Sequence, residues 1–375
     1  MDPSDSIPES AGTVIVGAGI VGCNIAYQLT KLGRDDVVVV DQGPMPTTGG
    51  SSTHAPGIMF QTAEPKELSQ FANYSRKLYS NLEGADGQQA YNETGGIEVA
   101  RSEERMAFLQ RRVEHAKAWG IPDPQILSPE EVTEHLPLVD KNQILGGYYS
   151  PTDGQVSGVI ACDALAREAI DRGAEFVPHT RTEDVEVTNG SITAVETENG
   201  RIECNEVVVA TNIWARQLGE KLDVHIPVTP VEHQYTMTES LDELSENDVD
   251  ITEHPLFDNY ENVSGEKAKR LLVGPDRPIL RDQDNAMYYR THGDSYGIGS
   301  YNHDPIVPDP QELGTNDPDG EQGSVHEFTE EHMNTATHPD RPHKAPRQAS
   351  DELLPATDGA ELEFKYNGMF AESPN

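Results

Sequence analysis

The sequence predicts an α/β protein in which a parallel sheet flanked by helices is joined to a second region of antiparallel strands. Three observations support this fold class. Residues 13–41 form a strand–helix–strand pattern, residues 175–210 alternate between apolar and polar side chains, and residues 226–301 contain further β-rich runs. A length of 375 residues predicts one large domain or two interleaved ones.

The first unit begins with the apolar strand 13–16 and ends with the strand 37–40, which consists of four valines. A strand without polar residues is typical of a parallel strand that is buried on both faces. Between the two strands, apolar residues recur at helical spacing over residues 21–32, and Gly33 is placed to end the helix. This order predicts one complete βαβ unit.

Three further helices are expected, at 66–82, from Pro129 onward, and at 162–172. The helix at 66–82 is expected to bury one apolar side, which includes Leu68 and Phe71. The helix that begins at Pro129 follows a serine and reaches a glutamate three residues later, which is the pattern of a capping box.

Two Asn-Gly pairs, at 189–190 and 199–200, predict β-hairpins. Residues 305–350 are rich in proline, acidic residues and histidine, have little periodicity, and predict a long surface excursion. Trp119 and Trp214 are interpreted as core residues.

The chain carries 27 Lys and Arg residues against 65 Asp and Glu residues, so its formal net charge is −38. This charge disfavours nucleic acid and anionic membrane surfaces as partners. The acidic residues are spread along the whole chain and arginine outnumbers lysine, which favours a protein adapted to high salt. An ordinary acidic cytosolic protein is the alternative.

No apolar run approaches the length of about 18 residues that a membrane span requires, so none is expected. The three cysteines are far apart, which disfavours a disulfide framework and suits a reducing, cytoplasmic location. The histidines at positions 326, 332, 338 and 343 lack metal-ligand spacing. They are interpreted as solvated surface residues, and no metal site is expected.

Gly17, Gly19 and Gly22 form a Gly-x-Gly-x-x-Gly motif between the first strand and its helix. In such a motif the first glycine makes the tight turn, the second admits a pyrophosphate, and the third allows close packing of helix on strand. Asp41, at the end of the second strand, is placed to bind a ribose hydroxyl, which disfavours NADP. The alternative is a glycine-rich turn, but the ordered context favours a dinucleotide, either NAD or FAD.

Residues 49–57, Gly-Gly-Ser-Ser-Thr-His-Ala-Pro-Gly, follow this unit and resemble the flavin-anchoring loop of one flavoprotein family. That family contains dimethylglycine oxidase, dimethylglycine dehydrogenase and sarcosine dehydrogenase. Further segments similar to this family follow in order along nearly the whole chain: 95–100, 118–121, 145–147, 232–235, 278–281, 288–290 and 292–294.

The resemblance implies a D-amino-acid-oxidase-type fold, with a discontinuous, Rossmann-like FAD-binding domain and an inserted antiparallel-sheet substrate domain. The expected segments are 1–90, 151–225 and the start of a third, 331–375, for the FAD-binding domain, and 91–150 and 226–330 for the substrate domain.

The resemblance also implies FAD rather than NAD, held covalently through His54, whereas the loop alone would predict a solvent-facing histidine. Beside the three glycines and Asp41, it places the following residues around FAD: Ile20, Val21, Gln42, Ser51, Ser52, Thr53, His54, Ile58 and Thr182.

His233 and Tyr288 match the active-site pair of the family. The implied reaction is oxidative demethylation of an N-methylglycine, dimethylglycine or sarcosine, by hydride transfer from the N-methyl carbon to flavin N5. A neutral histidine beside a phenol can take a proton from the amine; the alternative is a core histidine bonded to a tyrosine. Arg290 is equally compatible with binding a carboxylate and with a structural ion pair.

Relatives in this family continue past the position of Asn375 with a strand and helix of the flavin domain and then a folate-binding aminomethyltransferase domain. The resemblance therefore implies a truncated chain or half of a split enzyme, with a separate folate-binding aminomethyltransferase chain as partner. The alternatives are a non-catalytic fragment that binds FAD weakly or not at all, and an NAD-dependent dehydrogenase.

Overall fold

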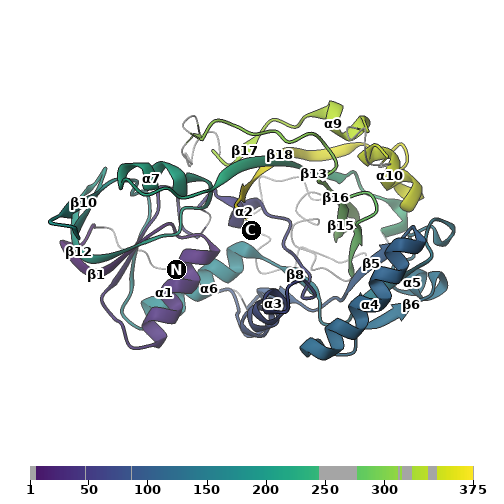
Figure 1. The fold of residues 1–375 in the computed structure, drawn as a ribbon, viewed down its shortest axis with the longest axis horizontal. Coiled ribbons are helices and arrows are strands. Elements are labelled where there is room, and N and C mark those ends of the chain that lie inside the picture. The colour runs from purple at the N-terminus through teal and green to yellow at the C-terminus, as the bar shows by residue number, and fades with distance from the viewer. Residues whose placement is uncertain are drawn as a thin grey trace.

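The computed structural model of the chain contains a six-stranded, a nine-stranded and a three-stranded sheet. Figure 1 shows the six-stranded sheet on one side of the molecule and the nine-stranded sheet on the other. No described helix is long and apolar enough to cross a membrane. The structure describes residues 6–46, 48–85, 87–244, 277–310, 313–314, 323–336 and 344–374.

The six-stranded sheet has the order β10-β11-β12-β1-β2-β9. The strands β12, β1, β2 and β9 are parallel, whereas β10, β11 and β12 form an antiparallel meander. Asn189 and Gly190 both have positive φ, 54° and 79°, as the predicted hairpin requires. The strands are β1 (Ser10–Val16), β2 (Val37–Val40), β9 (Glu175–Val177), β10 (Thr182–Thr188), β11 (Ser191–Thr197) and β12 (Gly200–Val209).

Helices α1 (Ile20–Lys31) and α6 (Gly158–Ile170) cover one face of this sheet, because their small apolar side chains pack against Ile15 and Val39. On the other face, valines of β1 and β2 pack against the meander and against Leu218 of α7 (Ala215–Lys221). The central strands are therefore buried on both sides, and the predicted βαβ unit is confirmed.

The nine-stranded sheet has the order β17-β18-β13-β16-β15-β14-β5-β7-β6, with only β14 and β5 parallel. One face packs against α5 (Pro129–His135), α9 (Glu330–Asn334) and α10 (Pro346–Leu353). The strands are β5 (Gly96–Ala100), β6 (Gln125–Leu127), β7 (Gly146–Ser150), β13 (Thr229–Thr238), β14 (Ile279–Asp282), β15 (Met287–His292), β16 (Ser295–Ser300), β17 (Val325–His326) and β18 (Leu362–Glu372).

A small third sheet has the order β3-β8-β4, and its central strand β8 lies between the two large sheets in Figure 1. The remaining elements connect the sheets or flank them. They are β3 (Ile58–Met59), β4 (Tyr91–Asn92), β8 (Gly154–Val156), α2 (Ser51–His54), α3 (Lys66–Tyr79), α4 (Glu103–Trp119), η1 (Lys141–Gln143), η2 (Asn212–Trp214), η3 (Asp242–Leu244) and η6 (Pro355–Thr357).

Two expectations about these elements are wrong. The helix predicted at 66–82 ends at Tyr79, and its Leu68 and Phe71 are exposed rather than buried. The described parts of 305–350 are not only surface, because Met333 of α9 and Ala349 of α10 belong to the core of the nine-stranded sheet. Lack of periodicity concealed these two short helices, since each contributes only a few apolar side chains.

The division into FAD-binding and substrate segments stays a prediction. The strands from 91–150, β5 to β7, and those from 226–330, β13 to β17, lie in the nine-stranded sheet, except for the short β4. The strand β18, from the range 331–375, lies in that same sheet and pairs with β13.

Candidate functional site

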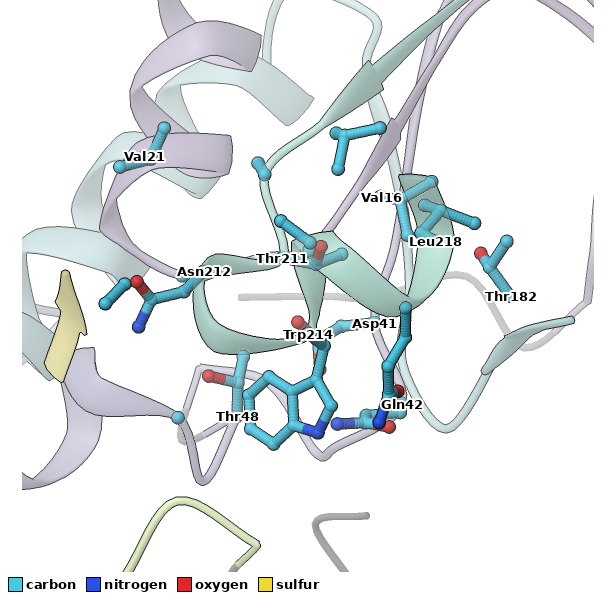
Figure 2. Close-up of a pocket in the computed structure, with 18 of the residues that line it drawn as sticks. Val16, Val21, Asp41, Gln42, Thr48, Thr182, Thr211, Asn212, Trp214 and Leu218 are labelled. Atoms are coloured by element: carbon cyan, nitrogen blue, oxygen red, sulfur yellow. The ribbon is translucent and has the colours of Figure 1, made fainter. Parts of the chain in front are cut away.

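A cavity of about 1010 Å³ lies at the carboxyl ends of the parallel strands β1, β2 and β12. The last residues of these strands, Val16, Val40 and Val209, form part of its wall. Figure 2 shows other lining side chains, from Val21 of α1 to Thr182 of β10. Ligands of open α/β sheets bind at this edge, so the fold itself places a binding site here.

The glycine-rich turn forms the floor of the cavity between β1 and α1. Gly17 has a φ of 106°, and a Cβ on it would lie 2.5 Å from the carbonyl oxygen of Ala210. A Cβ on Gly22 would lie 1.8 Å from the carbonyl oxygen of Gly17. Only glycine fits at these two positions, so the turn brings the N-terminus of α1 close to the strand ends.

Asp41 follows β2 and lines the cavity. One carboxylate oxygen accepts a hydrogen bond from the backbone N–H of Ala18, at 2.7 Å, and the other accepts one from Gly43, at 2.8 Å. Burial raises the pKa of Asp41 to about 6, although these two backbone bonds favour the charged form. The carboxylate therefore ties the glycine turn to the strand end and also faces the cavity.

Two threonine hydroxyls in the cavity wall indicate that a polar ligand belongs there. The Oγ1 atoms of Thr182 and Thr211 are buried and have no hydrogen-bond partner among the described residues. Buried polar groups are nearly always paired, so these two are explained by a bound molecule with polar atoms. Trp214 packs against a small core cluster and also lines the cavity, so its interpretation as a core residue is incomplete (Figure 2).

The helix α2 connects the glycine turn to the nine-stranded sheet. The backbone N–H of Ile20 donates to Ser52 Oγ at 2.9 Å, and Ser51 Oγ donates to the carbonyl oxygen of Met369 in β18 at 3.1 Å. The loop that carries His54 is thus held from both sides, by α1 and by β18.

His54 does not line the cavity but lies against β18. A Cβ on Gly368 would be 3.4 Å from its Nε2, and its Nδ1 lies 3.4 Å from Ser324 Oγ. Burial lowers the pKa of His54 to about 4, so the imidazole is neutral near pH 7. A neutral, half-buried histidine at the end of α2 is a different environment from the solvent-facing loop that the residues alone suggested.

The structure brings most of the predicted cofactor residues to one place. Four of the predicted residues do not line the cavity: Gly22, Thr53, His54 and Ile58. Gly22 packs beneath the turn, whereas His54 and Ile58 lie against the nine-stranded sheet. The predicted residues that line the cavity are Gly17, Gly19, Ile20, Val21, Asp41, Gln42, Ser51, Ser52 and Thr182.

A second group of side chains gathers on the face of the nine-stranded sheet opposite α5, α9 and α10, and we call it the aromatic face. Tyr235 of β13 and Tyr288 of β15 both lie opposite Gly299 of β16 in the strand register. Their rings are 6.1 Å apart, and a Cβ on Gly299 would lie 1.9 Å from the ring of Tyr288. Ile58 packs against this pair, so the loop that follows His54 reaches the aromatic face.

His233 and Tyr288, the predicted catalytic pair, are joined through a third residue. The ring of Tyr301 lies 4.8 Å from that of His233 and 5.0 Å from that of Tyr288. Burial, together with the neighbouring His303, lowers the pKa of His233 to about 4, so it is neutral near pH 7. Burial raises the pKa of Tyr288 well above its ordinary value. Both side chains are therefore neutral in the conditions of a cell.

Arg290 lies on the aromatic face and is half-buried, and burial of its guanidinium lowers its pKa. Its guanidinium donates to the carbonyl oxygen of Pro56 and lies 3.4 Å from Nδ1 of His292, and no described carboxylate forms an ion pair with it. Since arginine only donates, Nδ1 of His292 accepts, and its Nε2–H donates to the hydroxyl of Tyr235, at 2.7 Å. Arg290 was compatible with binding a carboxylate ligand or with a structural ion pair. Among the described residues no such ion pair is found.

Sequence reasoning missed several residues of the aromatic face. Strand alternation could have found Tyr235, two residues after His233, but no motif pointed to Tyr301 or His303. The solvated-surface interpretation is wrong for His332, whose ring stacks on that of His303, and incomplete for His326, which bonds Glu232 at 2.7 Å. His338 and His343 lie outside the described residues, and no cluster of metal-binding side chains occurs in the described parts of the chain.

The glycine turn, the acidic strand end and the cavity at the edge of a parallel sheet define a dinucleotide-binding protein. The chain belongs to the DAO family of FAD-dependent oxidoreductases, whose family model matches residues 13–371. This membership confirms the predicted fold class and supports FAD, rather than NAD, as the cofactor.

Known proteins similar to this chain include both enzymes and a regulatory subunit. It is 35% identical to the mitochondrial pyruvate dehydrogenase phosphatase regulatory subunit of Mus musculus over 64% of this chain and 27% of that protein. It is 28% identical to mitochondrial sarcosine dehydrogenase of Mus musculus over 81% of this chain and 30% of that enzyme. The chain thus spans less than a third of the length of either relative.

Among solved structures, the crystal structure of L-proline dehydrogenase from P. horikoshii has the same fold. The TM-score is 0.74 at 21% identity, and the match covers 98% of this chain and 83% of that one.

Proposed function

We propose that the chain binds FAD in the cavity and oxidatively demethylates an N-methylglycine, dimethylglycine or sarcosine, on the aromatic face. The observation that carries this proposal is the buried guanidinium of Arg290, which has no carboxylate partner among the described residues and shares a sheet face with His233. A buried charge requires a partner, and the carboxylate of a glycine derivative supplies one.

The residues of the chain have distinct tasks in this reaction. Arg290 binds the substrate carboxylate, and neutral His233 accepts the proton of the substrate ammonium group, which frees the nitrogen lone pair. The rings of Tyr235 and Tyr288 exclude water from the amine. When bound, FAD supplies the hydride acceptor, flavin N5. The residues that would hold it line the cavity, including the unpaired hydroxyls of Thr182 and Thr211.

His54 is the proposed attachment point for a covalent flavin. Its half-buried, neutral imidazole has a lone pair available, and its loop connects the cavity to the aromatic face through α2 and Ile58. We include in the proposal a cytoplasmic location and a separate folate-binding aminomethyltransferase chain that takes up the one-carbon unit. The similarity to sarcosine dehydrogenase supports the substrate class.

The test is anaerobic reduction of the flavin. The chain, saturated with FAD, is mixed with dimethylglycine or sarcosine, and we expect the yellow absorbance of oxidised flavin to disappear. Trimethylamine, which has the N-methyl group but no carboxylate, is the matched control and should reduce the flavin far more slowly. Unchanged absorbance with both glycine derivatives contradicts the proposed reaction.

A second candidate is a non-catalytic, regulatory role. The observation that favours it is the 35% identity to a phosphatase regulatory subunit. In that case the chain would bind FAD weakly or not at all, or would hold it without reduction by any N-methylated glycine. Chemical reduction with dithionite in the same experiment shows whether a bound flavin is present and competent to accept electrons.

A further inference from the structure

The strongest additional feature near the aromatic face is a contact between two histidines. Nδ1 of His233 lies 3.2 Å from Nε2 of His303, and Nδ1 of His303 lies 2.8 Å from the backbone carbonyl oxygen of Asp304. His303 follows β16 and is 6% exposed, so its two ring nitrogens are held by the protein and not by solvent.

These two contacts determine where the protons are. A carbonyl oxygen can only accept, so Nδ1 of His303 carries a proton and donates it to Asp304. In a neutral ring the other nitrogen, Nε2, is then an acceptor. The proton in the contact between the two rings therefore belongs to Nδ1 of His233, and the unprotonated nitrogen of His233 is Nε2.

We propose that His303 is a positioning residue that fixes the tautomer of His233, so that Nε2 of His233 presents its lone pair to the substrate amine. This inference rests on the proposed function, in which His233 acts as the base that takes the proton of the substrate. In the step, the N–H bond of the substrate ammonium breaks, its electron pair stays on the amine nitrogen, and the proton binds to Nε2 of His233. The imidazolium that forms keeps its Nδ1–H bond to His303.

The contacts around His233 agree with this assignment. Its Nε2 makes no hydrogen bond with any residue that the structure describes. The rings of Tyr301 and Phe370 stand edge-on to the imidazole ring, with centroid distances of 4.8 and 4.9 Å. Nε2 of His233 is thus available to a ligand, whereas Nδ1 is occupied by the hydrogen bond to His303.

The charged and titratable groups that face the two histidines come from several elements. His332 of α9 stacks on His303 at 5.2 Å, and Glu232 of β13 and Asp304 lie near it. Glu232 is itself committed to His326 and Asn367, at 2.7 and 2.9 Å. Burial lowers the pKa of His303, so the ring is neutral near pH 7, as the tautomer argument requires.

The direct test is the protonation state of each ring nitrogen, measured by ¹⁵N NMR of the full chain with labelled histidine at pH 7. His233→Asn identifies the His233 signals by their disappearance. We expect protonated Nδ1 and unprotonated Nε2 at His233. A proton on Nε2 of His233 in the unchanged chain overturns the proposal, and this measurement requires neither substrate nor flavin reduction.

Two variants separate positioning from simple packing. His303→Gln places an amide oxygen near the position of Nε2, where it can still accept from His233, whereas His303→Leu removes the acceptor. We expect His303→Leu to slow flavin reduction by dimethylglycine by about 100-fold, within the range of general base catalysis, and His303→Gln to restore most of the rate. Equal rates for the two variants overturn the proposal.

The outcomes also distinguish this inference from the proposed function. If His233 carries its proton on Nδ1 but no N-methylglycine reduces the flavin, the reaction is wrong and the tautomer assignment holds. If the flavin is reduced while His233 carries its proton on Nε2, the reaction holds and the role of His303 is wrong. Should His303→Leu fail to fold, the NMR spectra of the unchanged chain and of His303→Gln decide.

Discussion

The hydroxyl of Tyr366 donates a hydrogen bond of 2.7 Å to the backbone carbonyl oxygen of His54. Tyr366 belongs to β18, next to β13 of the nine-stranded sheet, whereas His54 ends α2, which contacts the glycine turn of the six-stranded sheet. The bond therefore fixes the position of the imidazole relative to both sheets. The centroid of the His54 ring is also 5.9 Å from that of the Tyr366 ring.

This placement predicts the outcome of His54→Ala. If His54 attaches the flavin, acid precipitation of the unchanged chain gives a yellow pellet, and the variant releases its colour into the supernatant. His115→Ala is the control, because His115 is an exposed histidine on α4. A pellet that stays yellow in His54→Ala contradicts the attachment at this residue.

The glycine turn predicts a stability effect for Gly22→Ala. Alanine is favoured over glycine inside a helix by about 1 kcal/mol, but its Cβ would lie 1.8 Å from the carbonyl oxygen of Gly17. That contact is with backbone, and overpacking of this kind costs about 1–3 kcal/mol. We therefore expect a net loss in the free energy of unfolding, measured with urea, together with weaker FAD binding. Lys31→Ala, at the exposed end of α1, is the control. Unchanged stability and affinity in Gly22→Ala would contradict this account.

The sequence was sufficient to predict the first unit because its signals are local. The four valines of β2 and the helical spacing of α1 depend only on neighbouring residues, and both are where they were expected. In contrast, the apolar periodicity of α3 does not show whether another element of the fold covers its apolar side. Phe71 is 67% exposed, since no described element covers that side.

The aromatic face could not be predicted, because it depends on strand register between distant segments. Tyr235 and Tyr288 meet across Gly299 only in this register, and a shift by one residue would turn them to opposite faces. The contact of His233 with His303 likewise joins residues that are 70 positions apart. The resemblance to a family pointed to single residues of this face but gave no information about their partners.

Substitution of Arg290 tests how the substrate is selected. Arg290→Met removes the guanidinium, and a hydrogen bond to a charged group contributes about 1.5–3 kcal/mol. We therefore expect KM for dimethylglycine to rise by about 10- to 100-fold, with no corresponding loss for trimethylamine. Arg290→Lys keeps the charge but not the planar fork, so its KM for dimethylglycine should lie between those of the unchanged chain and of Arg290→Met. An equal loss for both amines would show that the substitution acts through folding.

The lowered pKa of the half-buried His233 predicts an acid sensitivity of the fold. The pKa of His233 falls from an ordinary value of 6.5 to about 4 in the folded chain. A lowered histidine pKa stabilises the fold above pH 6.5, and this stabilisation is lost as pH falls toward 4. Asp41 acts in the opposite direction, because its pKa is raised to about 6. Its stabilisation is present below its ordinary value of 3.8 and is lost as pH rises through 6.

The contribution of His233 is therefore measured as a difference between two proteins. We expect the fall in Tm from pH 7 to pH 5 to be smaller in His233→Asn than in the unchanged chain, because the variant has no imidazole to protonate. Asp41 and the other titrating groups are present in both proteins, so their effects cancel. A fall of equal size in both would contradict the assignment of a low pKa to His233.

The net charge of −38 predicts that salt stabilises the fold. Repulsion among like charges opposes the compact state, and the Debye length falls from about 10 Å at 0.1 M salt to about 3 Å at 1 M. We expect Tm to rise by several degrees between 0.05 and 1 M KCl. Because screening is nearly complete at 1 M, a further rise up to 3 M would support adaptation to high salt, whereas a plateau would indicate an ordinary acidic protein. Sucrose, which stabilises by exclusion from the surface but does not screen charge, is the control. A Tm that falls or stays constant as KCl increases to 1 M would show that charge repulsion does not limit the stability of this fold.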